Sequence, residues 1–265
     1  MPIRWTKIEE RIKKKELLNL YCKRNNTIGE IATYLEMNQS SVYQRLLRLG
    51  IKPTPFKKKR YRNNNFNVII PKRYSSELAE FIGILLGDGH ITPTQVVITL
   101  GNKEMGYVGY ICDLMEKLFK VRPKASITKD GYSIVYLGSA KVVRWLLEMG
   151  LSFNKVASQV DVPTWCFRNK MYLRSLLRGL IDTDGSVYKL KFGMQISFCN
   201  RSIPLLSSTR RALIKSGFAP SRISGYNIYL TRKDDLLRYF KEIGFSNKKN
   251  KERFEMFYFK NGRFV

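Results

Sequence analysis

The chain has 265 residues, 44% of them hydrophobic, which is enough apolar material for one or two folded domains and excludes a disordered basic tail. Its 48 lysines and arginines against 21 acidic residues give a formal net charge of +27, which indicates a polyanionic partner, most often nucleic acid. No apolar run has the length of a membrane span, and Glu9 and Glu10 stand where a signal peptide would be apolar.

Cysteine and histidine usage excludes several kinds of site. Cys22, Cys112, Cys166 and Cys199 lack Cys-x-x-Cys spacing, so we expect neither a zinc site nor a disulfide framework. A reducing intracellular compartment (cytoplasm, nucleoid or organelle) is favoured over secretion. Because His90 is the only histidine, nucleases that combine a histidine base with histidine metal ligands cannot be assembled from this chain. We expect no small-molecule cofactor and no membrane partner.

The first predicted elements are helices. Ile12 to Asn25 is expected to form a helix with a basic face, and Thr27 with Glu30 has the pattern of a capping box. After a break at 36–38, a further helix over 39–49 ends before Gly50. Residues 1–54 resemble a small helix-turn-helix domain, with a generic helical hairpin as the alternative. The side chains expected to read a DNA groove are Gln39, Ser40, Ser41, Gln44, Arg45 and Arg48.

Residues 55–74 are the predicted linker, and they carry the basic run Lys57, Lys58, Lys59 and Arg60. Such a run is usually a solvated segment, and a nuclear localisation signal is the other simple interpretation. Between two DNA-binding parts we expect it to follow phosphates, which would make binding depend steeply on salt. The tether would also raise affinity through effective concentration.

Two segments then repeat one pattern, Phe81–Gly89 and Leu177–Gly185, with their aspartates Asp88 and Asp184 placed 96 residues apart. Each is an apolar helix with glycine at its third position, ending in a small residue, an aspartate and a glycine. Glycine inside a helix costs stability, so it indicates close approach of two helix backbones. The final glycine suits a left-handed residue that ends a helix. The pattern predicts that the paired helices bring two carboxylates together.

The similarity between the halves extends over about 95 residues. Residues 95–100 correspond to 195–198, and the helix openings at 102–103 and 200–201 correspond as well. Residues 145–152 match 239–246 with an offset of 94. Both halves predict the order helix, two strands, helix, two strands, helix. We interpret this as an internal duplication, too long for a solenoid repeat.

Over residues 75–260, the paired motifs, their spacing and the repeated element order resemble the single-chain LAGLIDADG homing endonucleases. The resemblance implies an α+β fold in which two pseudo-symmetric αββαββα repeats, residues 75–165 and 166–265, form a DNA-binding saddle with the motif helices at its centre. It also implies a monomer that makes a double-strand break in double-stranded DNA with a divalent metal, Mg²⁺ or Mn²⁺. Asp182 occupies the position of Leu86 and is given no catalytic role; a structural cap is its expected use.

The resemblance assigns Asp88 and Asp184 as metal ligands, and the free carbonyls at the helix ends, those of Gly87 and Thr183, would assist them. The metal would activate water and support the charged transition state and leaving oxygen. Lys155 matches the family's basic residue near the scissile phosphate. Its counterpart in the second half is Lys249 by the 94-residue offset, with Lys248 and Lys251 as alternatives.

Strand periodicity predicts a DNA-facing surface after the second motif. From Tyr188 to Phe198 apolar residues alternate with the set Lys189, Lys191, Gly193, Gln195 and Ser197, so Lys189, Lys191 and Gln195 are expected to face the groove. A hairpin near Gly193 would shift this parity by one. Further candidate DNA contacts are Gln95, Asn227 and Tyr229, with Gln95 and Gln195 also considered for ordering water.

The competing interpretation is a binder that does not cleave, either an intron RNA maturase or a DNA-binding transcription regulator on the same fold. Two intact motif aspartates favour cleavage, because a pure binder gains nothing from carboxylates at a DNA surface.

Overall fold

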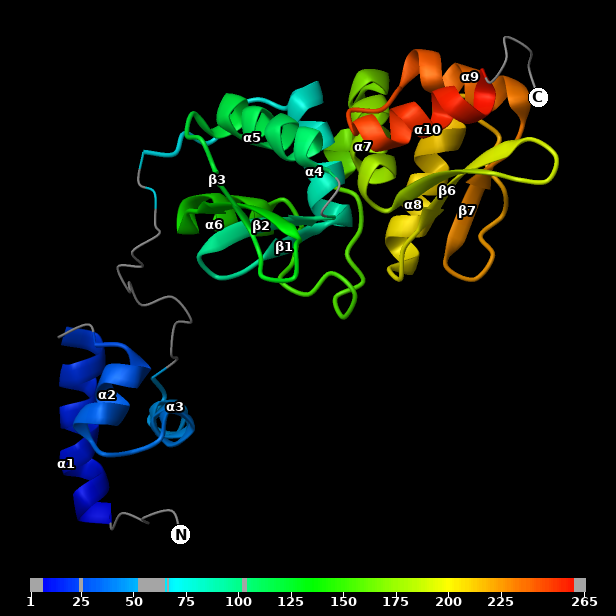
Figure 1. Ribbon diagram of the computed structural model, residues 1–265. Coiled ribbons are helices and arrows are strands. Elements are labelled where there is room, and N and C mark those ends of the chain that lie inside the picture. Colours follow the sequence, from blue (N-terminus) through cyan, green and yellow to red (C-terminus); the bar gives the residue numbers. More distant parts are fainter. Residues whose placement is uncertain (1–6, 24–25, 52–64, 66, 102–103, 260–265) are drawn as a thin grey trace. The chain divides into compact units, whose positions relative to one another are not determined.

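The computed structural model describes residues 7–23, 26–51, 65, 67–101 and 104–259, and the chain divides into two compact units, 1–62 and 63–265 (Figure 1). Much of the predicted linker, including Lys57, Lys58, Lys59 and Arg60, lies outside the described residues. Among the residues described, no helix is long and apolar enough to cross a membrane. The four cysteines, all within the described part, are free thiols.

The first unit is helical. Helix α1 (Lys7–Leu18) continues into a π-helical turn, η1 (Asn19–Lys23), so the first helix begins and ends earlier than the predicted 12–25. The capping box at Thr27 and Glu30 is present and starts α2 (Ile28–Tyr34). Asn38 caps α3 (Gln39–Arg48) by accepting from Ser41 N at 2.7 Å. The interior is formed by Leu17, Leu20, Tyr21, Ile31, Ala32, Val42 and Leu46.

The second unit contains the two predicted repeats. The elements of repeat one are α4 (Ser76–Gly87), β1 (Gly89–Ile91), β2 (Gln95–Leu100), α5 (Met105–Phe119), β3 (Lys124–Ile127), β4 (Ser133–Gly138) and α6 (Ala140–Glu148). This is the expected αββαββα order. The strands form one antiparallel sheet in the order β1-β2-β4-β3.

A short 3-10 helix, η2 (Thr164–Arg168), precedes repeat two. The elements of repeat two are α7 (Lys170–Thr183), β5 (Gly185–Lys189), β6 (Met194–Cys199), α8 (Ile203–Lys215), β7 (Asn227–Leu230), α9 (Lys233–Glu242) and α10 (Lys248–Tyr258). Its antiparallel sheet has the order β5-β6-β7. Residues 219–226, all described, form no regular strand where repeat one has β3. Their backbone is held instead by Ser221 N donating to Tyr229 O at 2.8 Å.

Helices α4 and α7 lie side by side between the two sheets (Figure 1), and one continuous apolar core covers the whole second unit. The predicted mixed fold, with two repeats, antiparallel sheets and an N-terminal helical region, is therefore confirmed. Its consequence for function is that the ends of α4 and α7 meet at one place.

Candidate active site

The two motif helices approach so closely that side chains are excluded at their crossing. A Cβ on Gly83 would lie 3.0 Å from Leu180 N and closer still to the Leu176 carbonyl. A Cβ on Gly179 would lie 2.8 Å from Ile84 N. Both glycines are thus required by backbone packing, as the sequence predicted.

Both aspartates stand at the ends of this helix pair in matching conformations. Asp88 is the C-cap of α4 with φ −84° and ψ 1°, and Asp184 is the C-cap of α7 with φ −85° and ψ 0°. Each carbonyl accepts from the neighbouring strand, from Thr99 N at 3.3 Å and from Cys199 N at 3.2 Å. A Cβ on Gly87 would lie 3.5 Å from Asp184 Cγ, so the carboxylate of one repeat lies against the helix end of the other.

The glycines that follow the aspartates have a different role from the one predicted. Gly89 and Gly185 do not have positive φ, so they are not left-handed helix terminators. Each instead begins a strand that turns sharply back against its own helix. A Cβ would lie 2.6 Å from Leu85 Cα at Gly89, and 2.7 Å from Ile181 Cα at Gly185. The requirement for glycine is steric contact, not backbone handedness.

The electrostatics of the carboxylate pair favour a bound cation. Burial raises the pKa of Asp88 to about 7, and the negative charges of Asp184 and Glu104 add to that rise. Burial also raises the pKa of Asp184. The hydrogen bond that Asn200 Nδ2 donates to its Oδ2 at 2.6 Å lowers that pKa and offsets part of the rise. Two buried carboxyls that resist ionisation together indicate a site that a positive charge would stabilise.

Lys155 supplies one such charge at the end of α4. Its ammonium donates to the carbonyls of Leu86 at 2.9 Å and Leu85 at 3.3 Å, and also to that of Gly87. Burial lowers the pKa of Lys155, while the charges of Asp184 and Asp88 raise it. The predicted lysine therefore lies at the end of α4, where its charge and those of both carboxylates influence one another.

Among the three lysines considered in the second half, Lys249 is the one whose charge acts on Asp88. Its Nζ bonds Glu104 Oε1 at 2.7 Å, and Asn247 Nδ2 donates to the same oxygen at 2.8 Å. Burial raises the pKa of Glu104, but these hydrogen bonds outweigh it and leave the pKa below its usual range. Lys248, by contrast, has a side chain 79% exposed and pairs with Glu252.

The donor set fits a divalent metal held partly by main chain. Within the described part of the chain, no three or more histidine, cysteine or acidic side chains gather as a metal site. Asp88 and Asp184 provide two hard oxygen ligands, and the carbonyls of Gly87 and Thr183 stand directly before them. Mg²⁺ commonly binds through only one or two carboxylates and retains water in its other positions. Two carboxylates plus carbonyls therefore match that ion.

Several polar residues at the site were not singled out from the sequence. Asn200 contacts Asp184 directly, and its place in the repeat correspondence was the available signal. Glu104 had no signal, since it opens α5 without being part of either motif. Its contacts with Lys249 and Asn247 join the first repeat to the C-terminal part of the second.

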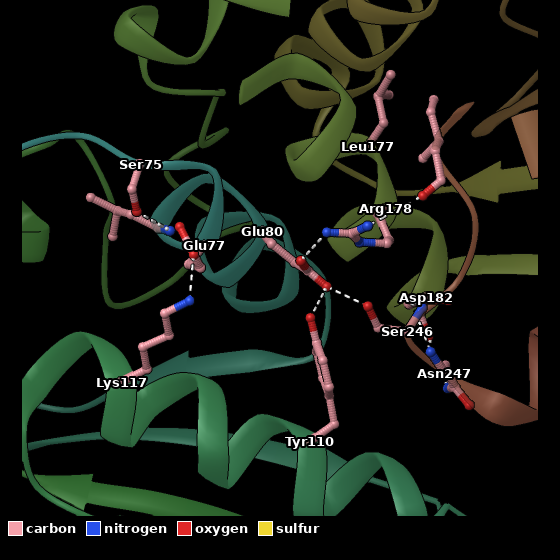
Figure 2. Close-up of polar contacts among 12 residues, drawn as sticks. Ser75, Glu77, Glu80, Tyr110, Lys117, Leu177, Arg178, Asp182, Ser246 and Asn247 are labelled. Carbon is pink, nitrogen blue, oxygen red and sulfur yellow. Dashed lines mark hydrogen bonds and ion pairs between the residues drawn. The ribbon is translucent and has the colours of Figure 1, made fainter. Parts of the chain in front are cut away.

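A second group surrounds Glu80 in the middle of α4 (Figure 2), where this carboxylate is 2% exposed. Arg178 NH2 donates to it at 2.5 Å, Tyr110 OH at 2.7 Å and Ser246 Oγ at 2.6 Å. These partners come from α7, α5 and the turn after α9, so the charge is paired by both repeats. A buried charge is costly unless it is paired and hydrogen-bonded, and these three donors meet that requirement for Glu80.

Asp182, for which the sequence suggested a structural cap, lies within α7 and bonds the turn that leads into α10, whose N-cap is Asn247 (Figure 2). Its Oδ2 accepts from Ser246 N at 2.7 Å and from Asn247 N at 3.1 Å, just before α10 begins. Burial raises the pKa of Asp182 to about 7, although both hydrogen bonds act to lower it. The contacts explain why this acidic residue, absent from the first motif, stands in the second.

The predicted DNA-reading side chains of the first unit lie on α3. Gln39, Gln44 and Arg48 are exposed, while Ser41 and Arg45 are half-buried. Arg45 also donates to Met37 Sδ at 2.7 Å. These placements leave the predicted reading face accessible on the unit described.

The predicted parity of the strands after the second motif is wrong for β5. Tyr188 pairs with Gln195 across the hairpin, and Lys189 pairs with Met194, so Lys189 shares the core-side face of β6. The turn at 190–193, closed by Leu190 N donating to Gly193 O at 2.9 Å, shifts the alternation by one. Lys191 lies in this turn and is exposed. Gln195 is covered by Tyr188, whose hydroxyl it contacts.

The remaining candidates are half-buried strand residues. Gln95 opens β2 opposite Gly138, while Asn227 and Tyr229 on β7 pair with Cys199 and Ser197. All three stay predicted DNA contacts.

Comparison with known families gives a match to the second repeat. Residues 171–244 match the family model described as the LAGLIDADG-like domain. The replication factor C small subunit of Methanocaldococcus jannaschii is 28% identical over 186 residues, which are 66% of this chain and 10% of that protein. The chain spans only 10% to 20% of the length of the curated relatives it matches.

The solved structures that match part of this chain include the following two. The N-terminal LAGLIDADG domain of DUF199/WhiA has a TM-score of 0.48 and 16% identity, covering 68% of this chain and 88% of that one. I-DmoI in complex with DNA and Ca has a TM-score of 0.47 and 17% identity, covering 63% of this chain and 88% of that one. The family resemblance seen in the sequence is confirmed by the match over the second repeat.

Proposed function

We propose that this chain, whose residues 171–244 match the LAGLIDADG-like domain, is a site-specific DNA endonuclease that makes metal-dependent double-strand breaks. The observation that carries the proposal is the pairing of Asp88 and Asp184 at the ends of two closely packed helices. Each repeat contributes one carboxylate in the same backbone conformation. Two equivalent aspartates that lie close together suit a substrate with two equivalent strands to cut, such as duplex DNA.

In this proposal Asp88, Asp184 and the carbonyls of Gly87 and Thr183 hold a divalent cation. When bound, the cation supplies charge stabilisation and water activation for phosphodiester hydrolysis. Asn200 orients the Asp184 carboxylate by donating to Oδ2. The Lys155 ammonium provides a further positive charge beside both carboxylates, where it would attract the scissile phosphate.

Charge and the first unit support DNA as the substrate. The net charge of +27 creates a field that attracts polyanions before any specific contact forms. The helix α3 presents glutamine and arginine side chains, which are suited to reading base edges. We propose that this helix-turn-helix unit lengthens the recognition site and that the chain binds double-stranded DNA as a monomer.

One contact favours a second candidate, a nucleic-acid binder that does not cleave. The Lys155 ammonium donates to the Gly87 carbonyl, which the metal would also use, and it partly neutralises the carboxylate pair without a metal. A regulator or RNA maturase on this fold would need only that neutralisation. The two candidates differ in one measurable property, cleavage in the presence of Mg²⁺ or Mn²⁺.

The decisive experiment incubates the protein with a pool of supercoiled plasmids carrying randomised inserts, with Mg²⁺, with Mn²⁺ and with EDTA. We expect linear product only with metal, and we expect Asp88→Asn and Asp184→Asn to abolish it while DNA affinity stays within about threefold. Asp130→Asn, an equal change of charge in the exposed β3–β4 turn, is the matched control. Full cleavage by either motif variant would refute the metal site, and binding without cleavage by the unmodified protein would favour the second candidate.

The role proposed for the first unit has its own test, removal of residues 1–60, which form most of a separate compact unit. We expect weaker binding, a flatter dependence of affinity on salt and a shorter footprint, with unchanged cut positions. Gln44→Ala with Arg48→Ala in the full chain should shorten the footprint in the same region. An unaltered footprint and salt slope after the deletion would show that this unit does not read DNA.

A further inference from the structure

The hairpin that follows each motif differs in length between the repeats. In repeat one, Thr99 N donates to Asp88 O, which closes a span of 11 residues. The equivalent bond in repeat two, from Cys199 N to Asp184 O, closes a span of 15. The hairpin between β5 and β6 is therefore longer by four residues, and its loop projects beyond the sheet in Figure 1.

The tip of this longer hairpin combines an exposed aromatic ring with basic side chains. Phe192 is 85% exposed, and the Nζ of Lys191 lies 5.4 Å from the centre of its ring. Lys189, at the end of β5, is also exposed, and no acidic residue occurs between Gly185 and Gln195. A single exposed apolar side chain is common on protein surfaces, so it is the combination of this ring with basic side chains in the turn of the longer hairpin that points to a partner.

The tip is held in a defined conformation. Leu190 N donates to Gly193 O at 2.9 Å, and Gly193 has φ +91°, a value that favours glycine. A closed turn loses little conformational freedom on binding. The turn that carries Phe192 is therefore already ordered before DNA binds.

We propose that the tip formed by Lys189, Lys191 and Phe192 is a wedge that binds double-stranded DNA beside the target, with the Phe192 ring against or between bases. This inference rests on DNA binding as proposed above. Lys189 and Lys191, which precede the ring in the chain, attract phosphates, and apolar side chains inserted at base steps are an established way for proteins to kink a duplex. An aromatic face also stacks on any base, so the contact needs no particular sequence.

Charge complementarity favours DNA over a protein partner. A protein-docking site normally presents a contiguous apolar area, whereas here exposed lysines at 189 and 191 alternate along the chain with the apolar Leu190 and Phe192. The lysines would disfavour burial in an apolar interface but suit a phosphate backbone. The extra hairpin length belongs to one repeat only, so the wedge would act at one side of the target.

The test places a fluorescent reporter at the tip by making Phe192→Trp, with Ile214→Trp as a matched control on α8, where Ile214 is 46% exposed. Both variants carry the same three native tryptophans as background. The probe is a mixed-sequence 40-base-pair duplex, about four helical turns, at saturation judged by anisotropy. We expect iodide quenching of the Phe192→Trp signal to fall severalfold on binding, with no change for Ile214→Trp.

Affinity measurements separate stacking from charge. Phe192→Ala should weaken duplex binding about 5- to 20-fold without changing the salt slope, whereas Lys191→Ala should reduce that slope by about one. Full iodide access at position 192 in the saturated complex overturns the proposal. Protection by single-stranded DNA or RNA, but not by duplex, overturns the choice of partner. A duplex that is bound and protected but never cut refutes only the nuclease, while absence of binding refutes both proposals.

Discussion

Around the two motif aspartates, the repeats have the same backbone and different side chains. Asp88 and Asp184 differ by one degree in φ and in ψ, and both carbonyls accept from the next strand. Yet Asp184 receives a hydrogen bond from Asn200, while Asp88 stands in the negative field of Glu104. The backbone at the crossing of α4 and α7 is fixed by close packing, so it must be the same in both repeats. The side chains around it are free to specialise.

The same contrast extends outward from the helix pair. Over the described residues, repeat one has four strands, while repeat two has three regular strands, a longer first hairpin and the additional helix α10. The differences begin within a few residues of the paired carboxylates. Symmetry is therefore retained where two backbones touch and lost where side chains meet solvent or a partner.

The largest expected effect tests the symmetric part of this comparison. Gly83→Ala and Gly179→Ala each force a Cβ into the backbone of the other helix, so each should lower the free energy of unfolding by about 3 kcal/mol. Urea unfolding, followed by the emission of Trp145 and Trp165, measures the change. Gly109→Ala in α5 is the control, because nothing lies within 4 Å of its added Cβ. That substitution should stabilise the protein by about 0.5–1 kcal/mol.

Equal losses in the free energy of unfolding at Gly83 and Gly179 would confirm that the helix crossing depends equally on both glycines. A loss confined to one of them would contradict the symmetric interface, and so would a loss at Gly109 as large as at the crossing.

A smaller effect tests the asymmetric part. The pKa of Asp88 is raised to about 7 in the folded state, so folded protein binds more protons than unfolded protein between about pH 4 and pH 7. Stability without metal should therefore fall as pH rises through that window. Asp88→Asn removes the charge, and at pH 8 in EDTA it should raise the free energy of unfolding by about 2 kcal/mol, with no gain at pH 4.

Asp184→Asn should give a smaller gain at pH 8, because Asn200 already stabilises that carboxylate. Mg²⁺ should stabilise the unmodified protein and have little effect on either variant, since ligand binding to the folded state raises stability. Denaturation from pH 4 to pH 8, with and without Mg²⁺, decides this. Identical pH profiles for the two variants would remove the proposed difference between the repeats.

The helix crossing and the helix cap of the first unit could be predicted from sequence, because each depends on the residue types at a few positions. Gly83 and Gly179 mark a close approach, and Thr27 with Glu30 encodes a cap, whatever the rest of the chain does. Glu104 and Asn200 could not be placed in the same way, because their partners are fixed only by tertiary packing. The positive φ expected at Gly89 failed for a related reason. Sequence shows that a side chain is excluded, but not which atom excludes it.

The smallest expected effect concerns the face of β5, where the hairpin reversed the predicted alternation. Cross-strand pairing places Tyr188 with Gln195 on one face and Lys189 with buried Met194 on the other. If the face of Tyr188 and Gln195 meets DNA, as the sequence led us to expect for Gln195, Tyr188→Ala should relax base preference at particular positions by about 1 kcal/mol. Lys189→Ala should instead weaken binding uniformly and reduce the salt slope by about one, as the loss of a phosphate contact does.

Tyr188→Phe separates the two parts of that expectation, because it keeps the ring and removes only the hydroxyl that contacts Gln195. We expect its preference profile to change at fewer positions than that of Tyr188→Ala. Binding to a library of single-base variants of the selected target provides the profiles. A profile altered by Lys189→Ala and unaltered by Tyr188→Ala would restore the original alternation. It would also mean that the hairpin changes its register when DNA binds, since one residue of slip moves every side chain to the opposite face.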